Sequence, residues 1–417
     1  MLYWLAEVTD FRLFQYLTFR AGLAVLIALI VTLVFGKSII SFIQKRQIIE
    51  KQRALGLPGE DIKANTPTMG GLMIHLAILL PCLLLADLTN VYIQLMILTT
   101  ISMGAIGFLD DYMKLTQSKD GLSGRYKILG QVLLGAIVGA VMLFHDDVVV
   151  RVDQTTAETY NYKVIDSIQV ERFARTTEGA LVPYQETMYY VKTTMTNVPF
   201  FKGNEFDYKY FLWFLGDKAK DWVFLIFIPI IILIVTAVSN AANLTDGIDG
   251  LAAGTSAIIG TALGLFAYVS GNNILADYLG VLYVPHVGEL VIFSACFLGA
   301  CIGFLWYNAY PAQVFMGDTG SLALGGIIAA LAVMTRKELL IPLLCGIFVA
   351  ENLSVVLQVS YFKYTKKKTG VGKRIFLMSP LHHHFQKKGI HESKIVARFW
   401  IVGVFLAVLT IITLKVR

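Results

Sequence analysis

The chain has 417 residues, of which 56% are hydrophobic and only 15% are charged, and its formal net charge is +6. Soluble domains carry about a quarter charged residues, whereas the mean hydropathy here is +0.66. The composition therefore excludes an ordinary soluble domain and predicts an all-α polytopic membrane protein. We expect its partner to be the lipid bilayer, and we expect no nucleic acid to bind.

Ten long apolar runs are spaced along the chain, and we interpret each as a transmembrane helix. A helix that crosses about 30 Å of hydrocarbon needs about 20 residues, so the second and eighth runs are short. No small-residue cleavage site follows the first run, which predicts an anchor and not a removed signal peptide. The predicted spans are residues 16–35, 71–86, 91–109, 128–144, 222–239, 251–269, 290–307, 321–334, 339–361 and 395–414.

Residues 145–221, between the fourth and fifth predicted spans, are polar. Val, Thr and Tyr recur at alternating positions in Val148–Asp153 and Glu186–Thr196, a pattern typical of short strands. We therefore predict three parts: helices one to four in 1–144, a small β-rich extracytoplasmic insertion in 145–221, and helices five to ten in 222–417. The sequence does not indicate what the insertion does.

Basic residues gather in the loops that follow the odd-numbered spans, above all the first, third and ninth. The positive-inside rule therefore places these loops in the cytoplasm and both chain ends outside. The four polar motifs described next follow spans three, five, seven and nine, so we expect them to share the cytoplasmic face of the membrane.

Two adjacent carboxylates, Asp110 and Asp111, end the third run in the motif DDYMK. A charge next to hydrocarbon needs a partner, a cavity or a function. Lys114 follows one helical turn later and can supply a cation to a carboxylate or grip a phosphate. The motif predicts catalysis at the membrane border, and the alternative is a solvated helix end with a local ion pair.

The motif NAANLTDGIDGL follows the fifth run, and its glycines allow a sharp turn or the close approach of a ligand. A cap at the start of the sixth span would leave N–H groups that attract an anion. Simple capping is the alternative, although it explains one polar residue better than four. The four, at a spacing of three, are Asn240, Asn243, Asp246 and Asp249.

Asp318 opens the eighth span between Gly317 and Gly320. A lone aspartate in such a turn is weak evidence, and a purely structural turn is the alternative. Its significance comes from the face that it is expected to share with the other motifs. Mg²⁺ prefers oxygen ligands, commonly one or two carboxylates together with substrate phosphates. Because the sequence has no His/Cys set at zinc spacing, magnesium is the better prediction.

Three consecutive histidines, His382, His383 and His384, lie in a basic loop after the ninth run. The run is internal, so it is no terminal tag. Metal binding and hydrogen bonding to a polar head group both stay open, and the alternative is a solvated basic loop near anionic lipid. The four cysteines all lie within apolar runs and suggest neither a disulfide framework nor a zinc site.

Five motifs, in this order, together resemble the phospho-N-acetylmuramoyl-pentapeptide transferases, the MraY family: KANTPTMGG, DDYMK, NLTDGIDGLA, YNAYPAQVFMGDTGSLALGG and PLHHHFQKKG. The likeness covers nearly the whole chain except 145–221, which is longer than is usual in the family. It implies transfer of phospho-MurNAc-pentapeptide from UDP-MurNAc-pentapeptide to undecaprenyl phosphate, which gives lipid I and UMP in peptidoglycan synthesis. It also implies Mg²⁺, ten helices, a homodimer and a place in the inner membrane with a cytoplasmic active site.

The resemblance also implies roles for individual residues. Asp318 is expected to bind magnesium, and Asp110 and Asp111 to serve catalysis. Asp110 is the candidate base that would deprotonate the lipid phosphate, and a covalent two-step route through Asp111 stays open. The resemblance places Lys63, Asn308, Phe315 and Asp249 at the uridine, Thr68, Asn243, Asp246 and Gly317 on the nucleoside side, and Lys114 and Lys127 near the phosphates, and it adds His382, His383 and His384 to the catalytic set.

Two other functions stay open on sequence alone. The nearer one is a related transferase that moves another HexNAc-1-phosphate from its UDP carrier to a polyprenyl phosphate. The more distant one is an ion-coupled transporter. Transporters tend to place charges at the membrane midplane and to show paired repeats. In this chain the acidic residues gather at the ends of spans, and no repeat is evident.

Overall fold

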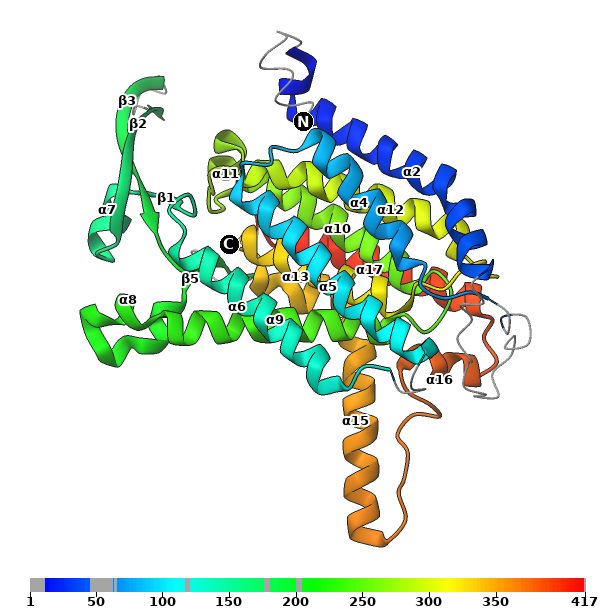
Figure 1. The fold of residues 1–417 in the computed structure, drawn as a ribbon. Helices are drawn as coiled ribbons and strands as arrows, with labels where there is room; N and C mark the ends of the chain where they lie inside the picture. Colours follow the sequence, from blue (N-terminus) through cyan, green and yellow to red (C-terminus); the bar gives the residue numbers. More distant parts are fainter. Residues whose placement is uncertain are drawn as a thin grey trace.

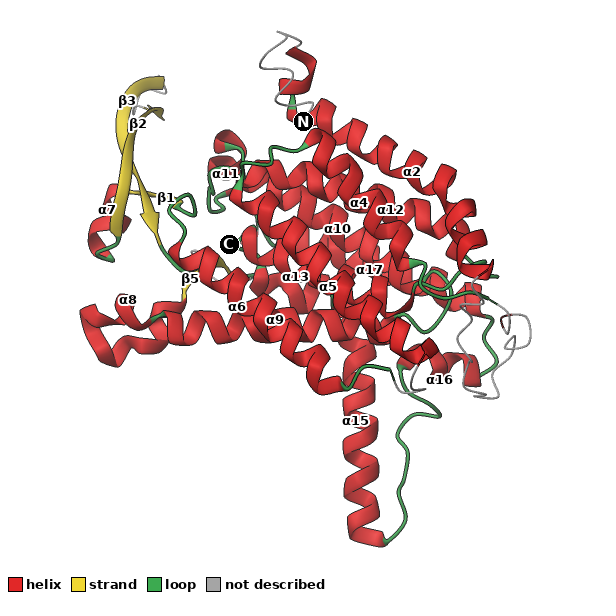
Figure 2. Cartoon of the chain, in the orientation of Figure 1, coloured by secondary structure: helices red, strands yellow, loops and turns green. Residues whose placement is uncertain are grey.

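Apolar helices make up most of the molecule. The structure is a computed structural model, which describes residues 12–45, 63, 66–116, 121–175, 181–199 and 205–415. Within these residues, eight helices are long and apolar enough to cross a membrane, and a bent helix pair is a ninth candidate. The chain is therefore an all-α polytopic membrane protein with small sheets, as predicted (Figures 1 and 2). Part of the first basic loop, 46–62 and 64–65, lies outside the described residues.

Each of the ten predicted runs coincides with a helix or with the bent pair. The shortest is α4, which has only 15 residues, as its run indicated. A short helix η1 (Arg12–Gln15) precedes the first span. The eight helices that are long and apolar enough to cross a membrane contain α2 (Leu17–Lys45), α5 (Val91–Thr116), α6 (Gly124–Phe144), α9 (Phe224–Thr245), α10 (Leu251–Ser270), α12 (Leu290–Asn308), α13 (Gly317–Met334) and α17 (Glu392–Ile412). The shorter helices are α4 (Gly71–Leu85), α11 (Asn273–Leu279), η3 (Val287–Glu289) and α16 (Leu381–Lys387).

The ninth run is not the single straight helix that its hydropathy predicts. The helices η4 (Glu338–Leu340) and α14 (Ile341–Leu344) are bent by 76° from α15 (Gly346–Thr369). Cys345, at the break, has non-helical backbone angles, and a methyl on Gly346 would lie 2.7 Å from the Leu406 side chain of α17. The break thus lets the chain pass close to α17, and α15 then leaves the bundle (Figure 1).

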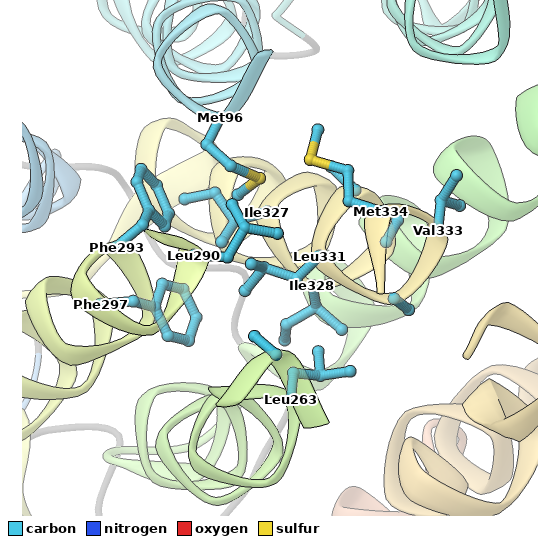
Figure 3. Close-up of a cluster of buried hydrophobic side chains, with 14 of the residues drawn as sticks. Met96, Leu263, Leu290, Phe293, Phe297, Ile327, Ile328, Leu331, Val333 and Met334 are labelled. Carbon is cyan, nitrogen blue, oxygen red and sulfur yellow. The ribbon is translucent and has the colours of Figure 1, made fainter. Parts of the chain in front are cut away.

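The centre of the bundle is α13, of which 89% is buried. Small residues let its backbone approach its neighbours: a methyl on Gly325 would lie 2.5 Å from Ser239 Cα of α9, and one on Gly326 would lie 2.7 Å from Met103 of α5. Such contacts are how helices associate where no water drives them together. Figure 3 shows the apolar core on the far half of α13, where Ile328 and Leu331 point among residues of α5, α10 and α12.

The predicted β-rich insertion contains two small antiparallel sheets, which confirms its predicted β content. One has the strand order β1-β3-β2, in which β3 pairs with both neighbours and forms a long hairpin with β2; the other pairs β4 with β5. Helical segments flank these strands. The elements are β1 (Val150–Asp153), α7 (Gln154–Thr159), β2 (Lys163–Arg175), β3 (Leu181–Lys192), β4 (Met195–Asn197), β5 (Glu205–Asp207), η2 (Tyr208–Lys218) and α8 (Ala219–Trp222).

The insertion is joined to the bundle at the end of α13. Asn197 N–H and Thr196 Oγ1 both donate to the Arg336 carbonyl, at 3.0 and 3.1 Å. Buried Lys337 contacts Asn197, and Tyr208 of η2 donates to Glu338 at 3.1 Å. Because α13 has 18 residues, about 27 Å long at 1.5 Å per residue, the insertion and Asp318 lie at opposite ends of one helix.

Candidate functional site

Three aspartates meet where the end of α5 faces the start of α13. One carboxylate oxygen each from Asp110, Asp111 and Asp318 lies within 4.8 Å of the others. Asp110 and Asp111 are fully buried, whereas Asp318 is partly exposed. The structure therefore brings together the acidic residues of two motifs that are some 200 residues apart in the sequence.

Glycines set the distance between these helices. A methyl on Gly107, one turn before Asp111, would lie only 2.1 Å from the backbone oxygen of Asp318. Gly317 has φ +72°, and a methyl there would lie 2.5 Å from Asp111 Oδ2. The positive φ favours glycine, and the close contact requires it. The two helices therefore meet backbone to backbone at the acidic cluster.

Asp111 caps α13 from another helix. Its Oδ1 accepts the N–H of Asp318 at 3.1 Å, and its Oδ2 accepts both the N–H and the hydroxyl of Thr319, at 2.9 and 2.7 Å. A carboxylate at a helix N-terminus satisfies N–H groups that have no partner within the helix and suits the helix dipole. Asp111 thus positions Asp318, a role that the sequence did not indicate.

Two lysines lie on the cluster. Lys114 Nζ is 2.8 Å from Asp110 Oδ2 and 3.2 Å from Asp318 Oδ1. Lys127 Nζ, from the first turn of α6, is 2.8 Å from Asp110 Oδ1 and 2.6 Å from Asp318 Oδ2. Asp110 also accepts the Leu122 N–H at 2.8 Å. Three carboxylates face two ammonium groups, so the site carries one excess negative charge and two cations able to bind phosphate.

The aspartates differ in how freely they can accept a metal. The carboxylate of Asp111 is held by the start of α13, and that of Asp110 by a backbone N–H. The oxygens of Asp318 meet lysine ammonium groups, whose long side chains can rotate toward an incoming anion. Three hard oxygen donors with excess negative charge fit a divalent cation such as Mg²⁺, and Asp318 is the best placed to hold it.

A second polar group lies beside the first, built on the turn between α9 and α10. Asp249 is buried; its Oδ1 accepts from Lys63 at 2.8 Å and its Oδ2 accepts from Ala312 N at 2.9 Å. Asn308 accepts the Gly250 N–H at 3.0 Å. Burial, and then the negative charge of Glu392, raises the pKa of the Asp249 carboxyl. The segment from Ala312 to Asp318 links the two polar groups along the chain, and Thr68, five residues after Lys63, has its hydroxyl near Gly317.

Glu392, at the start of α17, is a member of this group that the sequence reasoning missed. Its Oε1 accepts from Lys63 Nζ at 2.6 Å and from Asp249 N–H at 2.6 Å. The one signal available was its place, an acidic residue directly before the last apolar run. Without the fold, that place is equally typical of an ordinary first-turn carboxylate at a helix N-terminus.

The other residues predicted for the nucleoside side lie near the start of α13 or in the turn between α9 and α10. The strand-like segment around Thr68 pairs with Phe315, because Phe315 N donates to Pro67 O and Gly70 N donates to Phe315 O, both at 2.8 Å. Thr68 is buried, with its hydroxyl near Gly317. Asn243 donates to Ser321 of α13 at 3.0 Å, and partly buried Asp246 follows the end of α9.

The three histidines have three different environments. His382 is fully buried and its Nδ1 is 3.0 Å from Glu351 of α15, while a methyl on Gly247 would lie 2.2 Å from its Nε2. His383 bonds Gln386 at 2.7 Å, and His384 Nδ1 accepts the Leu377 N–H at 3.1 Å. Among the described residues, they join no cluster of potential metal ligands. Burial, and then the charge of Lys388, lowers the pKa of His384.

Comparison with known proteins supports one family. Residues 188–336 match the model of glycosyl transferase family 4, and residues 63–74 match phospho-N-acetylmuramoyl-pentapeptide-transferase signature 1. Relatives named phospho-N-acetylmuramoyl-pentapeptide-transferase are found in Flavobacterium psychrophilum (56% identical), Flavobacterium johnsoniae (55%) and Parabacteroides distasonis (50%). Each similarity covers 100% of both chains, so it includes the β-rich insertion.

Proposed function

Because the chain belongs to the phospho-N-acetylmuramoyl-pentapeptide transferase family, we propose that it transfers phospho-MurNAc-pentapeptide from UDP-MurNAc-pentapeptide to undecaprenyl phosphate, which yields lipid I and UMP. The observation that carries this proposal is the cluster of three aspartates and two lysines beside the Lys63–Asp249 group. Acids at helix ends suit phosphates handled at the membrane surface, whereas a transporter needs charges near the midplane.

In the proposed reaction an oxygen of the lipid phosphate attacks the β-phosphorus of the UDP-sugar. A new phosphorus–oxygen bond forms, the bond from that phosphorus to the bridging oxygen breaks, and UMP leaves. Lys114 and Lys127 are placed to bind the phosphates, and Asp318 to hold Mg²⁺. The metal, when bound, neutralises charge on the diphosphate. Positioning and electrostatics supply most of the catalysis.

The hydrogen bonds of the aspartates favour direct attack over a covalent intermediate. Asp111 accepts three hydrogen bonds from the start of α13, which makes its carboxylate a poor nucleophile. Asp110 contacts both lysines, which supports a role in orienting them. A base is of limited use, because the second pKa of a phosphate is about 6 and much of the lipid phosphate is already dianionic at neutral pH.

Uridine is proposed to bind at Lys63, Asp249, Asn308 and Phe315, with Thr68, Asn243, Asp246 and Gly317 on the nucleoside side. Their proximity to one another and to Asp318 supports this assignment. The Lys63–Asp249 ion pair can exchange its partners for the polar edge of a base, since buried polar groups favour any ligand that satisfies them.

The sugar specificity is tested by offering the purified protein two donors with undecaprenyl phosphate. We expect UDP-MurNAc-pentapeptide to give lipid-linked product and UMP, and UDP-GlcNAc to give at most a trace. A hydrophilic pentapeptide and an extra lactyl group are large differences, which a site with several buried polar residues can discriminate by roughly 10⁴-fold or more. Equal use of UDP-GlcNAc would assign the chain to the related HexNAc-1-phosphate transferases.

The orientation in the membrane is tested with reporters at both ends of the bundle. We expect a tag in 145–221 to be reached from outside the inner membrane and a tag in 363–394 to be reached only from the cytoplasm, because basic residues concentrate in the second segment. Detection of both tags on one side would contradict the proposed cytoplasmic active site.

The family resemblance also suggests a homodimer, which the mass of the protein in nanodiscs would test.

The histidines should differ in their effect on turnover. We expect His382→Ala to lower kcat on the order of 100-fold, because it opens a cavity between Glu351 and the Gly247 turn and shifts that turn at the site. His384→Ala, at a partly exposed position, is the matched control and should lose less than about 5-fold. Steady-state assays at saturating Mg²⁺, with and without a zinc chelator, measure this. Full activity of His382→Ala would contradict a role of this histidine at the site.

A further inference from the structure

The segment that joins the insertion to α9 has two unlike sides. Its inner side is buried: Tyr208 packs edge-on against Phe227 of α9 at 5.4 Å between ring centroids, and Leu212 is also covered. Its outer side carries large exposed rings, with Trp213 80% and Phe214 65% exposed. We call the exposed set the aromatic face; it consists of Tyr210, Phe211, Trp213 and Phe214 of η2 and Trp222 of α8.

The aromatic face is held firmly in place. The buried carboxylate of Asp207, which precedes η2, accepts from Tyr162 and Thr194 at 2.5 Å each and from the Lys209 N–H at 3.0 Å. Tyr208 is fixed to Glu338 at the end of the bundle core. Because the backbone is anchored on both the insertion and the bundle, the exposure of these rings is a property of the fold.

The aromatic face continues the lipid-facing surface of a membrane span. Residues 219–245 form one apolar stretch long enough to cross the bilayer. Leu225 and Leu233 of α9 are exposed on the outside of the bundle, where lipid would surround them. Four of the five rings precede this stretch and Trp222 lies in its first turn, at the end opposite Thr245 and the acidic cluster. In Figure 1, α8 lies at this far end of α9, while the β2–β3 hairpin extends away from it.

The chemistry of the face matches one surface, the boundary between lipid and water. Tyr and Trp concentrate at that depth because their rings are apolar and their edges are polar. Exposed Lys218 and Lys220 lie between Phe214 and Trp222 in the chain, and such long basic side chains suit lipid phosphates. A patch of five large aromatic side chains left in water would be unusual for a folded protein.

We propose that the aromatic face lies in the headgroup region of the leaflet opposite the acidic cluster and fixes the insertion on the membrane surface. The face is thus a lipid-binding surface of the insertion, separate from the transfer site. This assignment does not depend on the reaction that the acidic cluster performs.

Site-specific fluorescence in vesicles tests the proposal. The four native cysteines are buried, so a cysteine introduced at an exposed position can be labelled selectively with an environment-sensitive dye. The reporter is Trp213→Cys, with Phe214→Cys as a second reporter. Leu233→Cys on α9 is the control for the bilayer interior, and Val182→Cys on β3 is the control for an exposed position of the hairpin.

Each labelled protein is reconstituted in phosphatidylcholine–phosphatidylglycerol vesicles that carry a nitroxide either near the headgroup or in the middle of the acyl chain. We expect the shallow nitroxide to quench the dye at 213 and 214 roughly twofold or more better than the deep one, and the reverse at 233. The label at 182 should respond to aqueous iodide.

Three results would overturn the proposal. One is quenching at 213 and 214 by iodide alone, as at 182, which would place the face in water. Another is stronger quenching by the deep nitroxide, which would place it in the hydrocarbon. The third is protection from iodide without quenching by either lipid, lost as the protein-to-lipid ratio falls, which would make the face a contact between two copies of the chain.

Discussion

Asp318→Asn should lower Mg²⁺-dependent turnover by about 10³-fold, which corresponds to about 4 kcal/mol of transition-state stabilisation. The substitution keeps the size of the side chain and removes its charge. The N–H of residue 318 still donates to Asp111, so the start of α13 keeps its cap and the fold should persist. The measurement is the release of UMP at several Mg²⁺ concentrations.

The matched control for this variant is Asp166→Asn, which removes one carboxylate charge from an exposed position on the β2–β3 hairpin. It should leave turnover unchanged within about 2-fold. If Asp318→Asn instead retained near-normal activity and the same dependence on Mg²⁺, the metal would have to be assigned to Asp110 or Asp111.

Gly107→Ala should lower kcat on the order of 100-fold although the substituted residue bears no functional group. Its methyl would meet the Asp318 backbone at 2.1 Å, so α5 and α13 must move apart at the acidic cluster. A displacement of about 1 Å at a catalytic centre costs about this much. Steady-state kinetics and thermal unfolding in detergent together separate a displaced site from an unfolded protein.

Gly124→Ala is the control, because a methyl at this helical position of α6 meets nothing within 4 Å. Alanine is favoured over glycine within helices by about 0.5–1 kcal/mol, so neither variant should suffer from helix propensity. Equal activity of the two variants would show that the contact between α5 and α13 can relax without cost, and that the distance between the aspartates is not critical.

The sequence predicted those parts of the molecule that depend on local composition. Hydropathy identified the apolar runs because the side chains of each run must either pack inside the bundle or face lipid. Strand-like alternation found the sheets of the insertion. Both signals are contained in a few neighbouring residues, so they survive without knowledge of the fold.

Other parts depend on residues that are distant in the chain. The bend of 76° before α15 reflects the close passage of α17, which hydropathy does not register. Asp111 accepts the N–H of Asp318, 207 positions later, and Glu392 meets Lys63 across 329 positions. Such roles are set by tertiary packing, and a single sequence does not show which distant residue each side chain meets.

The charged turn Arg336–Glu338, at the end of α13 opposite Asp318, restricts how far the insertion can be shortened. Arg336, Lys337 and Glu338 are almost fully buried, and they are covered by β4 and η2 of the insertion. Cutting 145–221 down to a short loop would remove the Asn197 partner of Lys337 and the Tyr208 partner of Glu338, and a charge that stays buried without its partner costs several kcal/mol. We therefore expect a version of the protein with a shortened insertion to stay stable only when residues 336–338 are replaced as well.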